Sequence, residues 1–325
     1  MKRLLLLIFA FIFLVAAAGI WFIYGVTPPT SNKTSKRFVI DQGETATAIG
    51  QDLAKNNMIR SALAFRIYSQ VTQTARNIKP GSYELPGDLW IPQIVAKLLE
   101  GPSEVWVTVP EGLRREEVVV KFVNGFELTG KSSDKFSSQF LSLTSNKEGY
   151  LFPDTYLFAK DASASAVVTA MENNFESKYK IALKDKTNNL SREEIVTLAS
   201  IVQREAITPG DMQQVASTLL NRFNLGMPFG SDVTLEYGIG YDTTEKTWWK
   251  KDLTMDDLAL NSPYNTRLNA GFPPTPISNP GLVALSAAMN PPHTNYLYYL
   301  SDTNGKLHFA RTLEEHNANI AKYLQ

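Results

Sequence analysis

The sequence predicts an α+β fold preceded by one transmembrane helix. Residues 4–26 form an uncharged, mostly apolar run next to the N-terminus. After that run, helical and strand-like segments follow one another without the regular alternation of a doubly wound sheet. The chain has 325 residues, 44% of them hydrophobic and 20% charged, which is enough for two domains and a sizeable core. We therefore expect a membrane helix, a small first domain and a larger mixed α+β domain.

The composition excludes several classes of function. The formal net charge is zero, because 32 Lys and Arg residues balance 32 Asp and Glu residues. Nucleic acid is therefore not an expected partner, since contact with its phosphates requires a basic surface. The sequence contains no cysteine, which excludes disulfides, thiolate metal sites and cysteine nucleophiles.

The apolar run at residues 4–26 is long enough to cross a membrane. As a helix, it would extend ~35 Å, which exceeds the thickness of the hydrocarbon layer. Lys2 and Arg3 precede it, and positive charge at this end favours an N-terminus in the cytoplasm. Trp21 and Tyr24 lie near its far end, as is typical of side chains at the membrane interface. We expect a single-pass protein whose remaining chain lies outside the cytoplasm.

A cleaved signal peptide is the alternative for the same run. The residues from Ala16 to Gly19 follow a short apolar core and resemble a cleavage site. The apolar run continues beyond Gly19 to Val26, so an uncleaved anchor is favoured. Residues 27–36 are rich in Pro, Ser and Thr and have no apolar periodicity, which predicts a short extended tether.

A small first domain is expected over residues 37–103. Its pattern predicts, in order, a strand, two short helices, a second strand and a further helix. The β-α-α-β part of this order resembles a LysM-like module, and a generic α/β adaptor is the alternative. The predicted elements are a strand at 38–40, a helix around Ile49 and Leu53, a helix over 61–73, a strand after the turn at 79–83, and a helix over 92–99.

The larger domain is expected over residues 104–325. A strand-like segment starts at Val105, and Pro110, Glu111 and Gly112 form a turn before a helix. Residues 133–147 are polar and weakly periodic, and no element is assigned to them. Helices are expected over 163–179 and 190–206 and in the stretch that continues to Leu225, with a strand at 295–302 and a closing helix at 314–324.

The helix predicted over 190–206 carries the main catalytic candidate, Glu205. Ser191 and Glu194 have the S-x-x-E spacing of a capping box, which marks the start of this helix. At ~100° per residue, Glu205 projects within ~20° of Leu198 and ~40° of Ile201. The apolar face of the helix therefore carries a carboxyl group.

Burial of that carboxyl group would have a chemical consequence. Desolvation disfavours the charged form, so the pKa of Glu205 is expected to be raised and the group can act as a proton donor near neutral pH. The alternative is that Glu205, in the last turn, points to water beside Arg204.

Four loop segments share side chains that suit a sugar ligand. They combine amide, hydroxyl and aromatic groups with a backbone fixed by Pro and Gly, and such groups match the hydroxyls, acetamido groups and apolar faces of sugars. The alternative is that Asn, Pro and Gly here only form turns. The segments are residues 148–156, 230–238, 261–281 and 307–317.

Other active-site classes are not favoured. The histidines at 293, 308 and 316 lack metal-binding spacing, so no metal site is expected. Ser200 lies in the middle of a predicted helix and lacks the G-x-S-x-G elbow of serine hydrolases. The sequence has no Gly-rich phosphate loop, and no cofactor is expected.

Taken together and in order, the motifs of residues 37–325 resemble the YceG-like endolytic murein transglycosylases. The family's helix motif L-A-S-I-V-x-x-E is present as LASIVQRE, and one departure is Gln203, where many members carry a second Glu. The other matching motifs are E-G-x-x-x-P-D-T-Y at 148–156, N-R at 221–222, D-x-T-x-x-Y-G at 232–238, Y-N-T at 264–266, G-x-P-P-x-P-I-x-N-P-G at 271–281, and H-F at 308–309.

The resemblance implies a function and a set of site residues. It implies a lyase, anchored in the bacterial cytoplasmic (inner) membrane, that cleaves the β-1,4 bond between N-acetylmuramic acid and N-acetylglucosamine in nascent peptidoglycan strands, with peptidoglycan synthases as partners. The family's catalytic acid corresponds to Glu205, whereas Gln203 is expected to be non-essential. The expected substrate-binding residues are Asp232, Thr234, Tyr264, Asn265, Thr266 and His308.

Two alternative functions remain open at this point. A hydrolase is possible in principle if Asp232 or Asp154 lies across the cleft from Glu205 with room for a water molecule. The other alternative is a non-enzymatic wall-binding or scaffold protein that uses the LysM-like domain and the membrane anchor.

Overall fold

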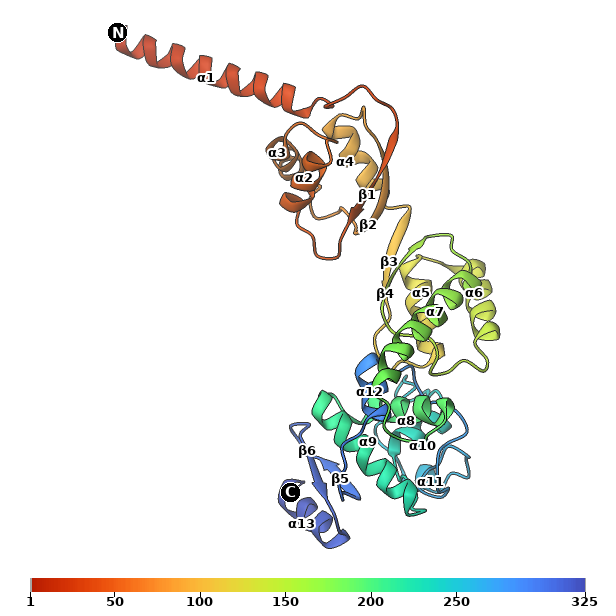
Figure 1. The fold of residues 1–325 in the computed structure, drawn as a ribbon. Helices are drawn as coiled ribbons and strands as arrows, with labels where there is room; N and C mark the ends of the chain where they lie inside the picture. Colours follow the sequence, from red (N-terminus) through yellow and green to blue (C-terminus); the bar gives the residue numbers. More distant parts are fainter. Residues whose placement is uncertain (1, 325) are drawn as a thin grey trace. The chain divides into compact units, whose positions relative to one another are not determined.

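The computed structural model describes residues 2–324 and divides into two compact units (Figure 1). The first unit comprises the chain up to Val107 together with Tyr156–Asp161. The second comprises Thr108–Thr155 together with the chain from Ala162 onward. Strands and helices occur in both without regular alternation, so the predicted mixed α+β class is confirmed.

The N-terminal helix α1 (Lys2–Val26) is long and apolar. Its segment Leu6–Val26 has the length and hydropathy of a membrane-spanning helix, criteria that a signal sequence also meets. The C-terminal end of α1 packs against the rest of the first unit, because Val26 belongs to the core of that unit and the Arg60 guanidinium lies 4.7 Å from the ring centre of Tyr24.

The first unit is a four-stranded sheet with three helices and the order β1-β2-β3-β4. Strands β1 and β2 pair antiparallel from Ser35↔Pro86 to Ile40↔Gly81. The element order β1-α2-α3-β2 matches the predicted β-α-α-β order, and β1 includes the last two residues of the predicted tether. The elements are β1 (Ser35–Ile40), α2 (Ala46–Lys55), α3 (Ala62–Val71), β2 (Gly81–Pro86), α4 (Ile91–Glu100), β3 (Glu104–Thr108) and β4 (Thr155–Ala159).

The second unit is mostly helical and ends in a β-hairpin and a helix. In the hairpin, β5 and β6 pair antiparallel from Tyr298↔Ala310 to Ser301↔Leu307. The elements are α5 (Arg115–Gly125), α6 (Gly130–Leu143), α7 (Ala164–Ala182), the 3₁₀ turn η1 (Leu183–Asp185), α8 (Arg192–Glu205), α9 (Pro209–Asn224), α10 (Asp232–Ile239), α11 (Met255–Leu258), α12 (Leu282–Met289), β5 (Tyr298–Ser301), β6 (Leu307–Ala310) and α13 (Leu313–Tyr323).

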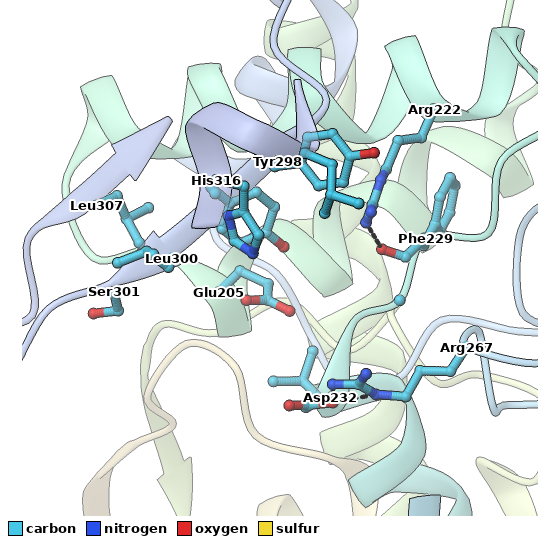
Figure 2. A pocket seen from close by; sticks show the side chains of 14 residues that line it. Glu205, Arg222, Phe229, Asp232, Arg267, Tyr298, Leu300, Ser301, Leu307 and His316 are labelled. Carbon is cyan, nitrogen blue, oxygen red and sulfur yellow. Dashed lines mark hydrogen bonds and ion pairs between the residues drawn. The ribbon is translucent and has the colours of Figure 1, made fainter. Parts of the chain in front are cut away.

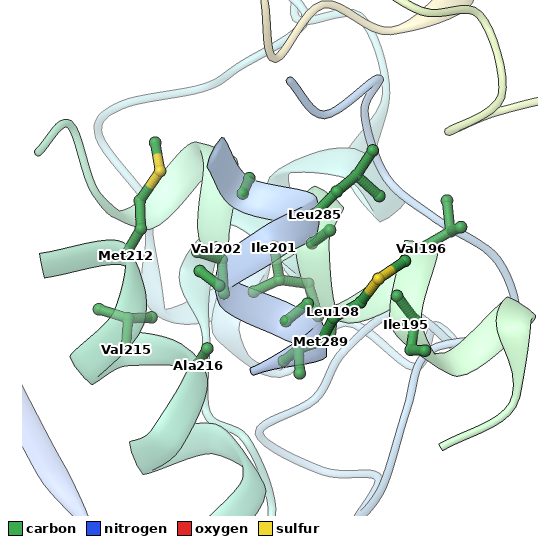
Figure 3. Close-up of a cluster of buried hydrophobic side chains, with 14 of the residues drawn as sticks. Ile195, Val196, Leu198, Ile201, Val202, Met212, Val215, Ala216, Leu285 and Met289 are labelled. Atoms are coloured by element: carbon green, nitrogen blue, oxygen red, sulfur yellow. The ribbon is translucent and has the colours of Figure 1, made fainter. Parts of the chain in front are cut away.

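Helix α8 lies in the core of the second unit, where it packs against both α9 and α12 (Figure 3). It begins at the predicted capping box, in which the Ser191 hydroxyl accepts the backbone N–H of Glu194 and the Glu194 carboxylate accepts that of Ser191. Every residue from Ile195 to Val202 is buried. Because packing surrounds the helix on all sides, the position and direction of its C-terminal turn are fixed.

Helices α6, α10, α11 and α12 were not predicted from the sequence, and α10 lies almost entirely in the segment 230–238 that was expected to be a loop. Helix α6 occupies most of the segment left unassigned, and only Phe136 and Phe140 in it are buried, one turn apart. Two inward-facing side chains in a polar segment give a weak periodic signal. Helix α12 follows a Pro-rich loop and is apolar all round, with Leu285 and Met289 fully buried, so it carries no amphipathic period.

Candidate functional site

The candidate site is a cavity of about 460 Å³ in the second unit (Figure 2). Its walls come from the C-terminal end of α8, from α9 and α10, and from the hairpin β5–β6 with α13. The lining combines charged, aromatic and aliphatic side chains. The lining residues are Glu205, Arg222, Phe229, Gly230, Asp232, Val233, Arg267, Tyr298, Tyr299, Leu300, Ser301, Leu307, Leu313 and His316.

Glu205 is the last residue of α8, and its carboxyl group faces this cavity (Figure 2). The Ser231 hydroxyl donates a hydrogen bond to Oε1 of Glu205, and the nearby Tyr299 hydroxyl favours the charged form of the carboxyl group. The neighbouring Arg204 turns elsewhere, with its guanidinium 3.8 Å from the ring centre of Trp249. The alternative in which Glu205 points to water beside Arg204 is therefore wrong.

The pKa of Glu205 is raised above its ordinary value, as predicted. Burial is the main cause, because it disfavours the charged carboxylate, and the nearby negative charge of Asp232 acts in the same direction. The hydrogen bond from Ser231, the nearby Tyr299 hydroxyl and the charge of Arg204 oppose this shift without cancelling it. Glu205 therefore has the environment of a proton donor.

Asp232 lies at the first turn of α10 and also lines the cavity. Its Oδ1 accepts the Nε–H of Arg267 at 2.7 Å and lies 2.5 Å from Nη2 of the same guanidinium (Figure 2). Asp232 therefore lies at the site as expected, next to Arg267, a residue that directly follows the matched Y-N-T motif but was not predicted to take part.

Thr234 and Thr266 were predicted to bind substrate, but they lie beneath the cavity instead. Both are buried, with exposed fractions of 0% and 1%. Their hydroxyls are 2.7 Å apart, and Thr234 donates to the Ser231 carbonyl while Thr266 accepts the Ser231 N–H. These two residues therefore hold Ser231 against Glu205, since their own groups have no open path to a ligand.

Asn265 is also a correction to the predicted set of substrate contacts. Its side chain is fully buried. The amide nitrogen donates to the carbonyls of Leu258 and Leu260 at 3.1 and 2.9 Å, and the amide oxygen accepts the N–H of Arg267 at 3.1 Å. Asn265 therefore fixes the loop that carries Arg267.

Tyr264 and His308 do not line the cavity that contains Glu205. Nε2 of His308 lies 2.9 Å from a carboxylate oxygen of Asp302, and its ring stacks on Tyr323 with the centroids 3.6 Å apart. His308 follows Leu307 in β6, and because side chains alternate along a strand, Leu307 lines the cavity while His308 faces away.

Tyr264 lines a second cavity of about 390 Å³, whose floor includes Glu148. Glu148 is buried and accepts hydrogen bonds from the Arg115 N–H, the Asn279 amide and the Tyr237 hydroxyl. Burial raises the pKa of Glu148 to about 8. Because its partners come from three separate segments, Glu148 is a structural tie within the second unit.

Asp154 and Gln203, two residues considered in the sequence analysis, do not line the cavity. Asp154 accepts the N–H of Thr155 at 2.8 Å and the amide of Asn174 at 2.9 Å, so it is not the second carboxylate across the cleft. Gln203 accepts the backbone N–H of Gly281 at 3.0 Å. Among residues 2–324, no group of three or more potential metal ligands is present.

The sequence analysis missed five side chains of the site: Ser231, Tyr299, Arg222, Arg267 and His316. Ser231, Arg267 and His316 lie within three of the segments predicted to suit a sugar ligand, and Arg222 lies in the matched N-R motif, so position in the sequence was a usable signal for these four. Tyr299 had no such signal, because it is one of several aromatic residues in a predicted strand.

Comparison with known proteins relates this chain to the YceG-like family and to endolytic murein transglycosylases. Residues 38–322 match the YceG-like family. The chain is 30% identical over 319 residues to an endolytic murein transglycosylase of Bacillus subtilis, covering 90% of this chain and 86% of that protein. It is 26% identical over 331 residues to one of Streptococcus pneumoniae, covering 89% of this chain but 59% of that longer protein.

The fold of this chain is also similar to that of a solved yceG-like structure. The crystal structure of a yceG-like protein from Listeria monocytogenes matches with a TM-score of 0.55 and 30% sequence identity. The match covers 88% of this chain and 99% of that protein.

Proposed function

The chain belongs to the YceG-like family, and from that premise we propose that it is an endolytic murein transglycosylase, a lyase that cleaves peptidoglycan glycan strands. Two relatives carry that name, at 30% and 26% identity. The observation that carries the proposal is the half-buried carboxyl group of Glu205, which faces the cavity and has a raised pKa.

The bond cleaved is the β-1,4 linkage between N-acetylmuramic acid and N-acetylglucosamine. Protonated Glu205 donates its proton to the glycosidic oxygen, and the bond from that oxygen to the anomeric carbon breaks. The resulting carboxylate then takes the proton of the C6 hydroxyl of N-acetylmuramic acid as its oxygen bonds to the anomeric carbon. The products are a 1,6-anhydro end and a free hydroxyl, and Glu205 is protonated again without use of water.

One carboxyl group can serve both proton transfers, because the attacking hydroxyl belongs to the sugar itself. A hydrolase instead needs a second carboxylate that activates water. Asp232 is the other carboxylate in the cavity lining, and its Oδ1 is held by Arg267. Because this ion pair engages only Oδ1 of Asp232, the mass of the products decides between the lyase and the hydrolase.

The proposal places the reaction at the outer face of the bacterial cytoplasmic membrane. Helix α1 would cross the membrane once, with its N-terminus in the cytoplasm, as Lys2 and Arg3 favour. Residues 37–103 would act as a LysM-like domain. Cleavage of nascent strands there would terminate their elongation beside the peptidoglycan synthases.

The test is mass spectrometry of uncrosslinked glycan strands incubated with the full-length protein in detergent. Wild type should release internal fragments with 1,6-anhydro ends. Glu205→Gln keeps the shape of the side chain but has no carboxyl proton, so it should bind strands and leave them intact. Glu193→Gln, an exposed position on the same helix, is the matched control and should cleave like wild type.

Other results would select the alternatives. Fragments that are one water heavier, with reducing ends, would establish a hydrolase. Strand binding by wild type and Glu205→Gln alike, with no cleavage by either, would favour the wall-binding protein.

A further inference from the structure

His316 is the histidine that lies in the cavity with Glu205. It belongs to α13 and is half-buried, and Figure 2 shows the edge of its ring directed into the cavity toward Glu205. The other two histidines lie elsewhere, since His308 pairs with Asp302 and His293 is exposed on a loop. Helix α13 therefore contributes one polar side chain to the site, and this side chain faces the candidate acid.

The ring of His316 is held by packing and has no hydrogen bond of its own. It stacks on Tyr298 with the centroids 5.3 Å apart and the planes 25° apart. Its Nδ1 atom is buried and has no hydrogen-bond partner among residues 2–324. No hydrogen bond within residues 2–324 fixes the tautomer of the ring. Of its two nitrogens only Nδ1 is buried without a partner, which leaves Nε2 as the atom that can meet a ligand.

The charge state of His316 limits the kind of ligand it suits. Burial lowers its pKa, and the positive charge of Arg222 lowers it further. The imidazole is therefore neutral near pH 7 and has one donor and one acceptor. A sugar hydroxyl both donates and accepts, so it can pair with Nε2 in either tautomer. A carboxylate or phosphate only accepts, so it can pair with Nε2 of a neutral ring in one tautomer alone.

We propose that His316 contacts the substrate, and that its imidazole forms a hydrogen bond with a hydroxyl group of the sugar whose glycosidic bond Glu205 protonates. This contact orients the sugar ring over the carboxyl group of Glu205. The inference rests on the proposed function, because it assigns to His316 a contact with the same glycan substrate.

Two substitutions separate this role from simple packing. His316→Phe keeps an aromatic ring that can stack on Tyr298 but has no nitrogen. His316→Gln loses the ring and keeps a donor and an acceptor at a similar distance from the backbone. A hydrogen-bonding role predicts that Gln preserves more activity than Phe, whereas a packing role predicts the reverse.

The experiment measures kcat and KM for release of anhydro-ended fragments by the full-length protein, with melting temperatures for each variant. We expect His316→Phe to lower kcat/KM on the order of tenfold at an unchanged melting temperature, and His316→Gln to recover much of that loss. His293→Gln is the control for a histidine outside the cavity and should match wild type.

The outcomes distinguish the two proposals. If wild type cleaves strands and His316→Phe cleaves them equally well, or better than His316→Gln, the role of His316 is overturned while the enzymatic function stands. If wild type itself fails to cleave, the proposed function fails, and the assignment of His316 fails with it.

Discussion

The hydroxyl group of Ser231 donates a hydrogen bond to Oε1 of Glu205. This contact joins the last residue of α8 to the residue that precedes α10. Because Oε1 is already engaged as an acceptor, the acidic proton is favoured on Oε2. The buried threonine pair beneath Ser231 then fixes the direction in which that proton is presented.

Substitution of Ser231 by alanine should shift the pH dependence of cleavage. The hydrogen bond from Ser231 favours the charged carboxylate and lowers the pKa of Glu205, so its removal should raise that pKa further. Cleavage needs protonated Glu205, and the alkaline limb of the kcat profile should move to higher pH while kcat falls roughly tenfold from lost positioning. Ser217→Ala removes a hydroxyl bonded to Thr294 instead and should leave the limb in place.

The variant Asp232→Asn should move the same limb in the opposite direction. The negative charge of Asp232 raises the pKa of Glu205, so neutralising it lowers that pKa. Arg267, no longer paired with a carboxylate, adds positive charge to the cavity and acts in the same direction. The alkaline limb should therefore appear at lower pH. A limb that moves upward in both variants would contradict the electrostatic account.

Glu148 should make the protein less stable as the pH rises. Its pKa is about 8 in the folded protein and near 4.5 when exposed, so the folded state binds more protons between these values. The stabilisation is fully present below the lower pKa and is lost as the pH rises through the upper one. Melting temperatures measured across this range should decline for wild type. The decline should be smaller for Glu148→Gln, and an equal slope in both proteins would exclude Glu148 as its source.

Asn265 should affect stability before it affects chemistry. Its replacement by alanine leaves two carbonyls and the N–H of Arg267 without their partner in a buried loop. We expect a loss of about 2 to 4 kcal/mol in the free energy of unfolding, measured with urea. The exposed Asn269, replaced in the same way, should cost about 1 kcal/mol. Similar values for the two variants would argue against Asn265 as an anchor.

Gln203 should be dispensable for cleavage. Its side-chain oxygen accepts the N–H of Gly281, and the residue does not line the cavity. Gln203→Ala is expected to keep kcat near wild type and to lower the free energy of unfolding by about 1 kcal/mol. A loss of activity in a fully folded variant would show that the prediction from the sequence is wrong.

Much of the architecture was predictable because its signals lie between near neighbours in the chain. The capping box of α8 and its apolar period involve residues three or four apart, so they identified the helix and placed Glu205 on its apolar face. The length and hydropathy of α1 are equally local. By contrast, α12 gave no signal, because a helix that is almost entirely apolar has no polar face to define a period.

The role of each site residue could not be decided in this way. The sequence placed Thr234, Asn265 and Thr266 in the right region but could not distinguish contact with a ligand from burial beneath it. His308 was predicted to reach the substrate, and the alternation of side chains in β6 turns it away from the cavity.

The sequence by itself determined the α+β class, the apolar N-terminal helix and the identity of the candidate acid. The tertiary structure alone decided which groups meet that acid: Ser231 from the start of α10, Tyr299 from β5 and His316 from α13. The physical reason is the distance along the chain between the residues that interact. Helix and strand patterns depend on backbone geometry over a few residues, whereas desolvation and hydrogen bonding depend on segments that packing brings together from distant parts of the chain.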